Sequence, residues 1–115
     1  MLIAVADKRL RATLVDDRLV VRRYGQDMAR KIRLRLNSIS AADSLAVFYP
    51  PKSGPERCHE LIGDLAGVFS MDLKQPYRLL FSPTEPVPKE DFATELERWE
   101  AITSIAIRGI EDTHD

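Results

Sequence analysis

Few side chains in this sequence can exchange a proton near neutral pH, and they flank the part of the chain that predicts a sheet. They are His59, in RCHELIGD, and His114, in IEDTHD. Between them, Arg78 is the one basic residue of the apolar run YRLLF and keeps its positive charge at neutral pH. RNA cleavage by its own 2′-hydroxyl needs a base for that hydroxyl, an acid for the leaving 5′-oxygen and a cation for the pentavalent phosphate. These residue types therefore suit RNA cleavage without a metal or cofactor.

Each of these residues also has a structural interpretation. A lone histidine is usually a surface or packing residue, and Arg78 can equally well form a salt bridge with Asp72 across a hairpin. Cys58 is expected to be a small buried residue rather than a nucleophile, because no neighbouring group stabilises its thiolate. As the single cysteine of the chain it cannot form an intrachain disulfide, which fits a reducing cytoplasm.

Several classes of function are excluded by what the sequence lacks. No CxxC, HxxxH or HExxH spacing occurs, and the glycines are dispersed rather than gathered in a phosphate-binding loop, so neither a metal nor a cofactor is expected. The longest apolar run, residues 45–49, is too short to span a bilayer, and the N-terminus does not have the order of a secretory signal. We therefore expect a cytoplasmic protein with no membrane partner.

Helices are predicted mainly in the first forty residues. Asp7 is a plausible N-cap for a helix over 8–15, and a second helix is expected over 16–24. Gly25 is expected to end that helix in a left-handed conformation. The clearest helix is 26–40, where Met28, Ile32, Leu36 and Ile39 form an amphipathic stripe.

Strands are predicted mainly in the second part. Alternating residues over 68–73 and 77–82, joined by Lys74-Gln75-Pro76, indicate an antiparallel hairpin. The alternation places Arg78 on the face opposite Tyr77. Further strands are expected over 2–5 and 103–110, residues 82–88 are expected to be irregular, and a helix is expected over 89–101.

The length and the order of elements give the fold class. The chain has 115 residues, 44% of them hydrophobic and 30% charged, which fits one globular domain spanning 1–115. We predict an α+β fold with N-terminal helices packed on one face of a small antiparallel sheet.

The formal net charge of −1 hides an asymmetry. Residues 1–40 carry ten basic and four acidic side chains, a balance of +6, and residues 41–115 a balance of −7. The predicted helix 26–40 contributes Arg30, Lys31, Arg33 and Arg35. They form either a solvated face or a positive surface that attracts phosphates or an acidic protein.

The run HELIGDLAGVFSMDLKQPYRLLF resembles the strand core of the RelE/ParE superfamily, and within it the HigB-type toxins of bacterial toxin–antitoxin modules. The family pattern has His-Glu-Leu, a glycine, a hairpin ending in Tyr/Trp-Arg and apolar residues, and a last strand running into Asp-Tyr-His. The matching positions are His59-Glu60-Leu61, Gly63, Tyr77-Arg78-Leu79-Leu80-Phe81 and Asp112-Thr113-His114. The resemblance covers nearly the whole chain, with 83–101 as a Pro-rich connection and acidic helix that compact members lack.

The resemblance implies a RelE-like fold and a ribosome-associated mRNA endonuclease. Its catalytic residues would be His59, Arg78, Asp112 and His114, and Arg30, Lys31, Arg33 and Arg35 would contact RNA or the ribosome. The implied partner is a cognate HigA-type antitoxin with a helix-turn-helix domain, and operator DNA would be reached only through that antitoxin.

Two departures from the pattern leave other functions open. Ile62 stands where the family often has lysine, and Thr113 replaces the tyrosine that can stack on a base. A second hypothesis is therefore a catalytically degenerate RelE-fold protein that binds the antitoxin as a co-repressor. A third is a ParE-like toxin directed at DNA gyrase, since the fold alone does not fix the target.

Overall fold

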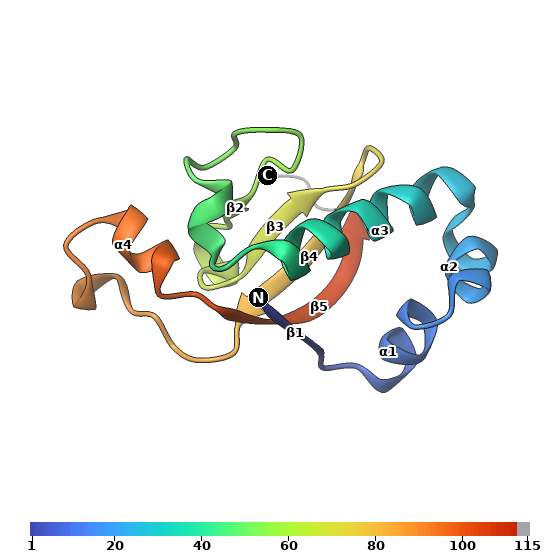
Figure 1. The fold of residues 1–115 in the computed structure, drawn as a ribbon, viewed down its shortest axis with the longest axis horizontal. Coiled ribbons are helices and arrows are strands. Elements are labelled where there is room, and N and C mark those ends of the chain that lie inside the picture. Colours follow the sequence, from blue (N-terminus) through green and yellow to red (C-terminus); the bar gives the residue numbers. More distant parts are fainter. Residues whose placement is uncertain (113–115) are drawn as a thin grey trace.

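Five strands and four α-helices make up the described part of the chain, residues 1–112 of the computed structural model (Figure 1). The strands are β1 (Leu2–Val5), β2 (His59–Glu60), β3 (Phe69–Asp72), β4 (Tyr77–Pro83) and β5 (Ser104–Asp112). The helices are α1 (Lys8–Leu14), α2 (Asp17–Tyr24), α3 (Gln26–Ala41) and α4 (Glu95–Glu100). Three short 3-10 turns, at Leu45–Phe48, Gly63–Leu65 and Lys89–Asp91, interrupt the connections.

The N-terminal helices begin at the capping residues that the sequence indicates. Oδ1 of Asp7 accepts a hydrogen bond from the backbone N–H of Leu10 at 2.8 Å, and the carboxylate of Asp16 caps α2 in the same way. Gly25 separates α2 from α3 with φ 85° and ψ 166°. The positive φ agrees with the prediction, but the extended ψ replaces the expected left-handed cap. Glycine is the residue that reaches this conformation without a steric penalty.

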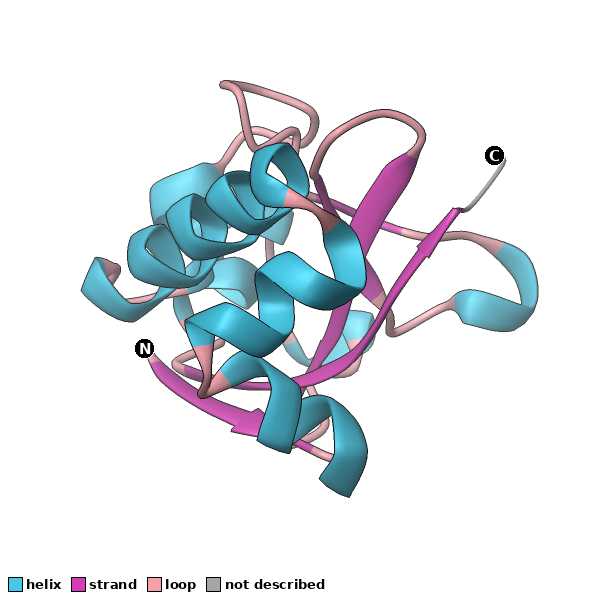
Figure 2. Cartoon of the chain, turned by 90° about the vertical axis from the view of Figure 1, so that its right-hand side faces the viewer, coloured by secondary structure: helices cyan, strands magenta, loops and turns pink. Residues whose placement is uncertain are grey.

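The strands form one sheet in the order β1-β5-β4-β3-β2. The α+β prediction is confirmed, and the sheet is mixed rather than wholly antiparallel, because β1 runs parallel to β5 while the other pairs are antiparallel. The predicted hairpin is β3–β4, with Phe69 opposite Phe81 and Met71 opposite Leu79. Figure 2 shows the longer helices on one side of these strands.

The main core lies between that face of the sheet and the helices. Ile32 and Ile39 of α3 pack in one cluster with Met71, Leu79 and Phe81 of the hairpin, and all five side chains are buried. On the opposite face, Leu61, Val68 and Leu80 form a smaller apolar cluster. Both faces of β3 are therefore covered, although only one was expected to be.

The predicted helix over 89–101 is wrong in its first half. The structure has a 3-10 turn at Lys89–Asp91, an extended residue at Phe92, and α4 only from Glu95. The reason is local, because the Thr94 hydroxyl accepts a hydrogen bond from the N–H of Glu97 at 3.1 Å and starts the helix there. Trp99 anchors α4 in the core, with its ring edge-on to Tyr49 and Phe69 at 5.4 and 5.6 Å between centroids.

Within residues 1–112 no helix has the length and apolar character that crossing a membrane requires.

Candidate active site

His59 is held by the backbone at the start of β2. Its ring is buried, and Nδ1 lies 2.9 Å from the carbonyl oxygen of Arg57. A carbonyl oxygen only accepts, so Nδ1 must carry a proton and donate it. Nε2 is then the ring nitrogen that can take up or release a proton in chemistry.

The carbonyl that orients His59 belongs to a residue in an unusual conformation. Arg57 has φ 47°, in the left-handed region that residues other than glycine seldom adopt. Its segment is fixed on both sides, because Cys58 O accepts from Lys52 N at 3.0 Å and Glu56 O accepts from Asp72 N at 2.8 Å. Strain of this kind is often found at functional sites.

Asp72, at the end of β3, arranges the arginines beside this histidine. Its buried carboxylate lies 3.5 Å from Nε of Arg57 and 3.7 Å from Nε of Arg78. The Gln75 amide adds a hydrogen bond of 3.4 Å. The predicted salt bridge between Arg78 and Asp72 is therefore present. Guanidinium groups can still bind phosphate oxygens bidentately, so a role for Arg78 in phosphate binding is compatible with this salt bridge.

The strand register places His59 and Arg78 on the same face of the sheet. His59 is paired with Ser70, and two residues further along β3 Asp72 is paired with Arg78. Paired residues of antiparallel strands share a face, and residues two apart lie roughly 7 Å from each other along a strand. The structure thus places His59, Asp72 and Arg78 on one face of the sheet, where Asp72 contacts Arg57 and Arg78.

Asp112 occupies a different position from the other predicted site residues. It is paired with Tyr77, whereas Glu111 is paired with Arg78. By alternation Asp112 belongs to the face of Tyr77 and Glu111 to the face of Arg78. His114 lies outside the described residues.

Comparisons with known proteins agree with the topology. No family model matches the sequence, and no curated protein matches it. The structure aligns with the YoeB/ParE toxin from Agrobacterium tumefaciens at a TM-score of 0.54 and 15% identity, covering 99% of this chain and 100% of that one. It also aligns with a chain of the YoeB–YefM complex from Staphylococcus aureus at a TM-score of 0.55 and 16% identity, covering 99% of each chain. This chain has the fold of the RelE/ParE toxins.

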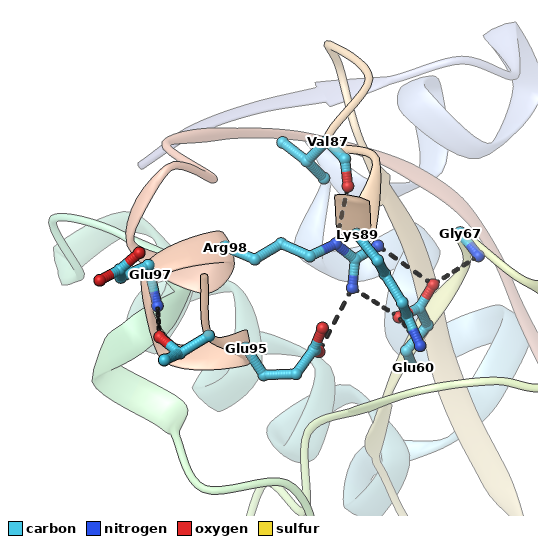
Figure 3. Close-up of polar contacts among 8 residues, drawn as sticks. Glu60, Gly67, Val87, Lys89, Glu95, Glu97 and Arg98 are labelled. Carbon is cyan, nitrogen blue, oxygen red and sulfur yellow. Dashed lines mark hydrogen bonds and ion pairs between the residues drawn. The ribbon is translucent and has the colours of Figure 1, made fainter. Parts of the chain in front are cut away.

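Glu60 connects β2 to the segment 83–101. Its carboxylate accepts hydrogen bonds from Nη1 of Arg98 at 2.7 Å, Nη2 of Arg98 at 3.3 Å and the N–H of Gly67 at 2.8 Å (Figure 3). Lys89 lies 3.8 Å away, and Nε of Arg98 donates to the Val87 carbonyl at 2.7 Å. Burial raises the pKa of Glu60, but the hydrogen bonds from Arg98 and Gly67 outweigh it and hold that pKa below its usual value.

The four basic residues predicted to contact RNA or the ribosome divide into two kinds. Arg30 and Lys31 are exposed on α3, and Arg33 is exposed but forms an ion pair with Asp17 at 2.6 Å. Arg35 is buried, with 5% of its surface exposed, and does not lie on that surface. It donates from Nε to the carbonyl of Asp72 at 2.7 Å and from Nη2 to the carbonyl of Pro55 at 3.1 Å.

Two features of the site escaped the sequence interpretation. Arg57 was not singled out, because nothing in its neighbours marks a left-handed residue whose carbonyl orients a histidine. The burial of Arg35 could have been predicted from the sequence. It lies three residues after Ile32 and four before Ile39, and so falls on the buried stripe of the helix.

Cys58 and the potential metal ligands have the following structural setting. Cys58 is completely buried, and burial raises the pKa of its thiol, so it is a packing residue as expected. Among residues 1–112, no three side chains of histidine, cysteine, aspartate or glutamate are grouped so that they could hold a metal ion.

Proposed function

We propose that this chain is the toxin of a type II toxin–antitoxin system, of the HigB type, and that it cleaves mRNA on the ribosome. One observation carries the proposal. A histidine whose Nδ1 proton is fixed by the Arg57 carbonyl shares a sheet face with an arginine aligned by Asp72. When a 2′-oxygen attacks the adjacent phosphorus, the reaction most needs a base for the 2′-hydroxyl and a cation for the phosphate.

The proposed reaction uses side chains alone. Nε2 of His59 takes the proton of a 2′-hydroxyl, whose oxygen attacks the adjacent phosphorus. Arg78 stabilises the negative charge of the pentavalent phosphate, with bidentate contacts that suit its oxygens. The bond from phosphorus to the 5′-oxygen then breaks, leaving a 2′,3′-cyclic phosphate and a 5′-hydroxyl. We propose that His114 donates the proton to the leaving 5′-oxygen and that Asp112 completes the site beside it.

The partners follow from the same proposal. One structural neighbour is a chain of a YoeB–YefM complex, which supports an antitoxin partner for this chain. We propose a HigA-type antitoxin with a helix-turn-helix domain, through which the pair reaches operator DNA, and a cytoplasmic site of action. The exposed side chains Arg30, Lys31 and Arg33 of α3 would dock on ribosomal RNA, with Arg35 holding that helix in place.

The test is induced expression without antitoxin, with mRNA 5′ ends mapped for the wild type, His59→Ala, Arg78→Ala and His114→Ala. We expect growth arrest and new 5′ ends for the wild type. The loss of a general base or a phosphate-binding cation should lower cleavage by about 10²–10⁴-fold. Arg18→Ala is the matched control, because its side chain is 92% exposed on α2, away from the site.

Each contrary result points to a different hypothesis. If His59→Ala and His114→Ala together leave toxicity and cleavage intact, the assigned site is wrong. If the wild-type chain is not toxic but represses its operator together with an antitoxin, it is a co-repressor. Broken DNA with intact mRNA would indicate a gyrase-directed toxin.

A further inference from the structure

A concave surface lies between the N-terminal helices and the last strand. It is a cleft of about 380 Å³ whose lining includes Arg9 of α1, Arg23 and Tyr24 of α2, and Arg108 and Glu111 of β5. Figure 1 shows α1 and α2 at one end of the molecule, on the side where β5 ends. We call this surface the arginine cleft.

Three arginines and two carboxylates, Asp7 and Glu111, line the arginine cleft, and the arginines form no ion pair with an acidic side chain of residues 1–112. Oδ1 of Asp7 caps α1 by accepting from the N–H of Leu10. Three guanidinium groups around one cleft repel one another, and a bound anion relieves that repulsion.

The sheet irregularity explains how Arg108 enters the cleft. Leu80 is paired with Gly109 and Phe81 with Ile107, so Arg108 is the extra residue of a β-bulge. Bulges redirect side chains, and they are frequent next to active sites. The bulge lies just beyond the part of β5 that pairs with β1, so this edge of the strand faces the cleft in place of a neighbouring strand.

The chemistry of the lining favours a nucleic acid strand. Guanidinium groups bind phosphate oxygens bidentately, and an aromatic ring offers a face on which a base can stack. Tyr24 is partly exposed, and the guanidinium of Arg23 lies over its ring, 5.2 Å from the centroid. Phosphate-binding cations beside a stacking ring are typical of proteins that hold single-stranded RNA.

The arginine cleft includes part of β5, the strand that pairs with the strand of Arg78. Glu111 lines the cleft and is paired with Arg78 on the neighbouring strand. Neighbouring strands lie about 5 Å apart, so one RNA chain can reach Arg78 and the cleft together. We propose that the arginine cleft binds the phosphates of the RNA that flanks the scissile bond, an inference that rests on the proposed nuclease function.

The test measures binding separately from cleavage. In a His59→Ala background, the full chain is titrated with a fluorescein-labelled single-stranded 12-nucleotide RNA at several salt concentrations. The cleft variant is R9A/R23A/R108A. The matched control is R11A/R18A/R22A, which removes the same charge from exposed positions of α1 and α2 that do not line the cleft.

We expect the cleft variant to bind the RNA at least tenfold more weakly and the control less than threefold more weakly. The slope of log affinity against log salt should fall by roughly 0.7 for each phosphate that the variant no longer binds. R9K/R23K/R108K should bind more weakly as well, because lysine keeps the charge but not the bidentate geometry. Thermal unfolding of all variants identifies any that are not folded.

Equal decreases in affinity for the cleft and control variants would overturn the proposal, because net charge would then explain the binding. So would a cleft variant that loses affinity for a poly-aspartate peptide but not for RNA, which would make the cleft a protein-binding site. Cleft-dependent RNA binding by a wild-type chain that does not cleave RNA would support the cleft and overturn only the nuclease function.

Discussion

Asp72 connects more parts of the candidate site than any of the residues that the sequence singled out. Its carboxylate lies between Arg57 and Arg78, its N–H donates to the carbonyl of Glu56, and its carbonyl accepts from Arg35. Helix α3, the segment before β2 and the hairpin therefore meet at one residue. A group that aligns a catalytic cation without touching substrate is a positioning residue, and its loss is felt through geometry.

Asp72→Asn keeps the backbone bonds and removes the charge between the two arginines. We expect RNA cleavage to fall by about tenfold to a hundredfold, because Arg78 loses its alignment. Single-turnover cleavage of a labelled RNA measures the effect. Asp91→Asn, at an exposed 3-10 turn, is the control. Cleavage at the wild-type rate would show that Asp72 does not position Arg78.

Arg35→Met tests whether this arginine is structural. Methionine fills a similar volume, but it leaves the carbonyls of Asp72 and Pro55 without their donors. We expect the free energy of unfolding in urea to fall by about 2–4 kcal/mol. The control Arg30→Met, on the exposed side of the same helix, should change it by less than about 0.5 kcal/mol. A value for Arg35→Met as small as the control would return Arg35 to the predicted RNA-binding surface.

At the scale of elements, the segment 83–101 is attached to the strand that carries His59. Arg98 of α4 binds Glu60, the residue directly after His59 in β2. β2 is only two residues long and pairs with one neighbour, so ladder hydrogen bonds alone hold it weakly. The ion pair and the buried ring of Trp99 together make the segment 83–101 a support for β2.

The Glu60–Arg98 pair predicts a pH dependence of stability. The pKa of Glu60 is lowered in the folded state, so the pair stabilises the fold above the unfolded glutamate pKa of about 4.3. That contribution is lost as the pH falls through the folded pKa. Glu60→Gln should lower the free energy of unfolding at pH 7 by about 2–4 kcal/mol and should flatten its fall on acidification.

Urea unfolding at pH 7, 5, 4 and 3 checks this dependence, with Glu90→Gln at an exposed position as the control. If Glu60→Gln and the wild type lose stability in parallel as the pH falls, other carboxylates account for the acid sensitivity.

At the scale of the whole molecule, the charge asymmetry of the sequence becomes a separation in space. The described chain measures 44 × 25 × 25 Å. Figure 1 shows α1 and α2 at one end of it and α4 at the other. Five acidic side chains belong to the α4 end: Glu90, Asp91, Glu95, Glu97 and Glu100. The distance between the ends is several times the screening length of about 8 Å at physiological salt.

The two ends should therefore act independently on RNA in physiological salt and not in dilute salt. Neutralising the acidic end with E90Q/D91N/E100Q should change the affinity for single-stranded RNA by less than about twofold at about 150 mM salt. At about 20 mM salt, where screening is weak, the affinity should rise several-fold. Fluorescence anisotropy at both concentrations measures this effect. An equal gain at both would mean that these acids lie against the bound RNA.

The sequence by itself determined the local structure that depends on neighbours along the chain. Asp7 and Asp16 cap their helices because a carboxylate reaches the N–H groups two or three residues ahead. The β3–β4 hairpin follows from alternation around a short turn, and its register is as the alternation predicts. His59 and Arg78 were chosen by residue type, and the strand pairs place them on one face.

The tertiary structure decided what depends on segments far apart in the sequence. The parallel pairing of β1 with β5, the burial of Arg35 and the position of Arg57 beside Asp72 need contacts that no local pattern encodes. The bulge at Arg108 is the clearest case. Counting by twos from Ile105 and Ile107 would place Glu111 on the face of the sheet that carries the core. The extra residue places the exposed Asp112 on that face instead and pairs Glu111 with Arg78. The register of one strand against its neighbour thus selects which carboxylate shares the face of the candidate site.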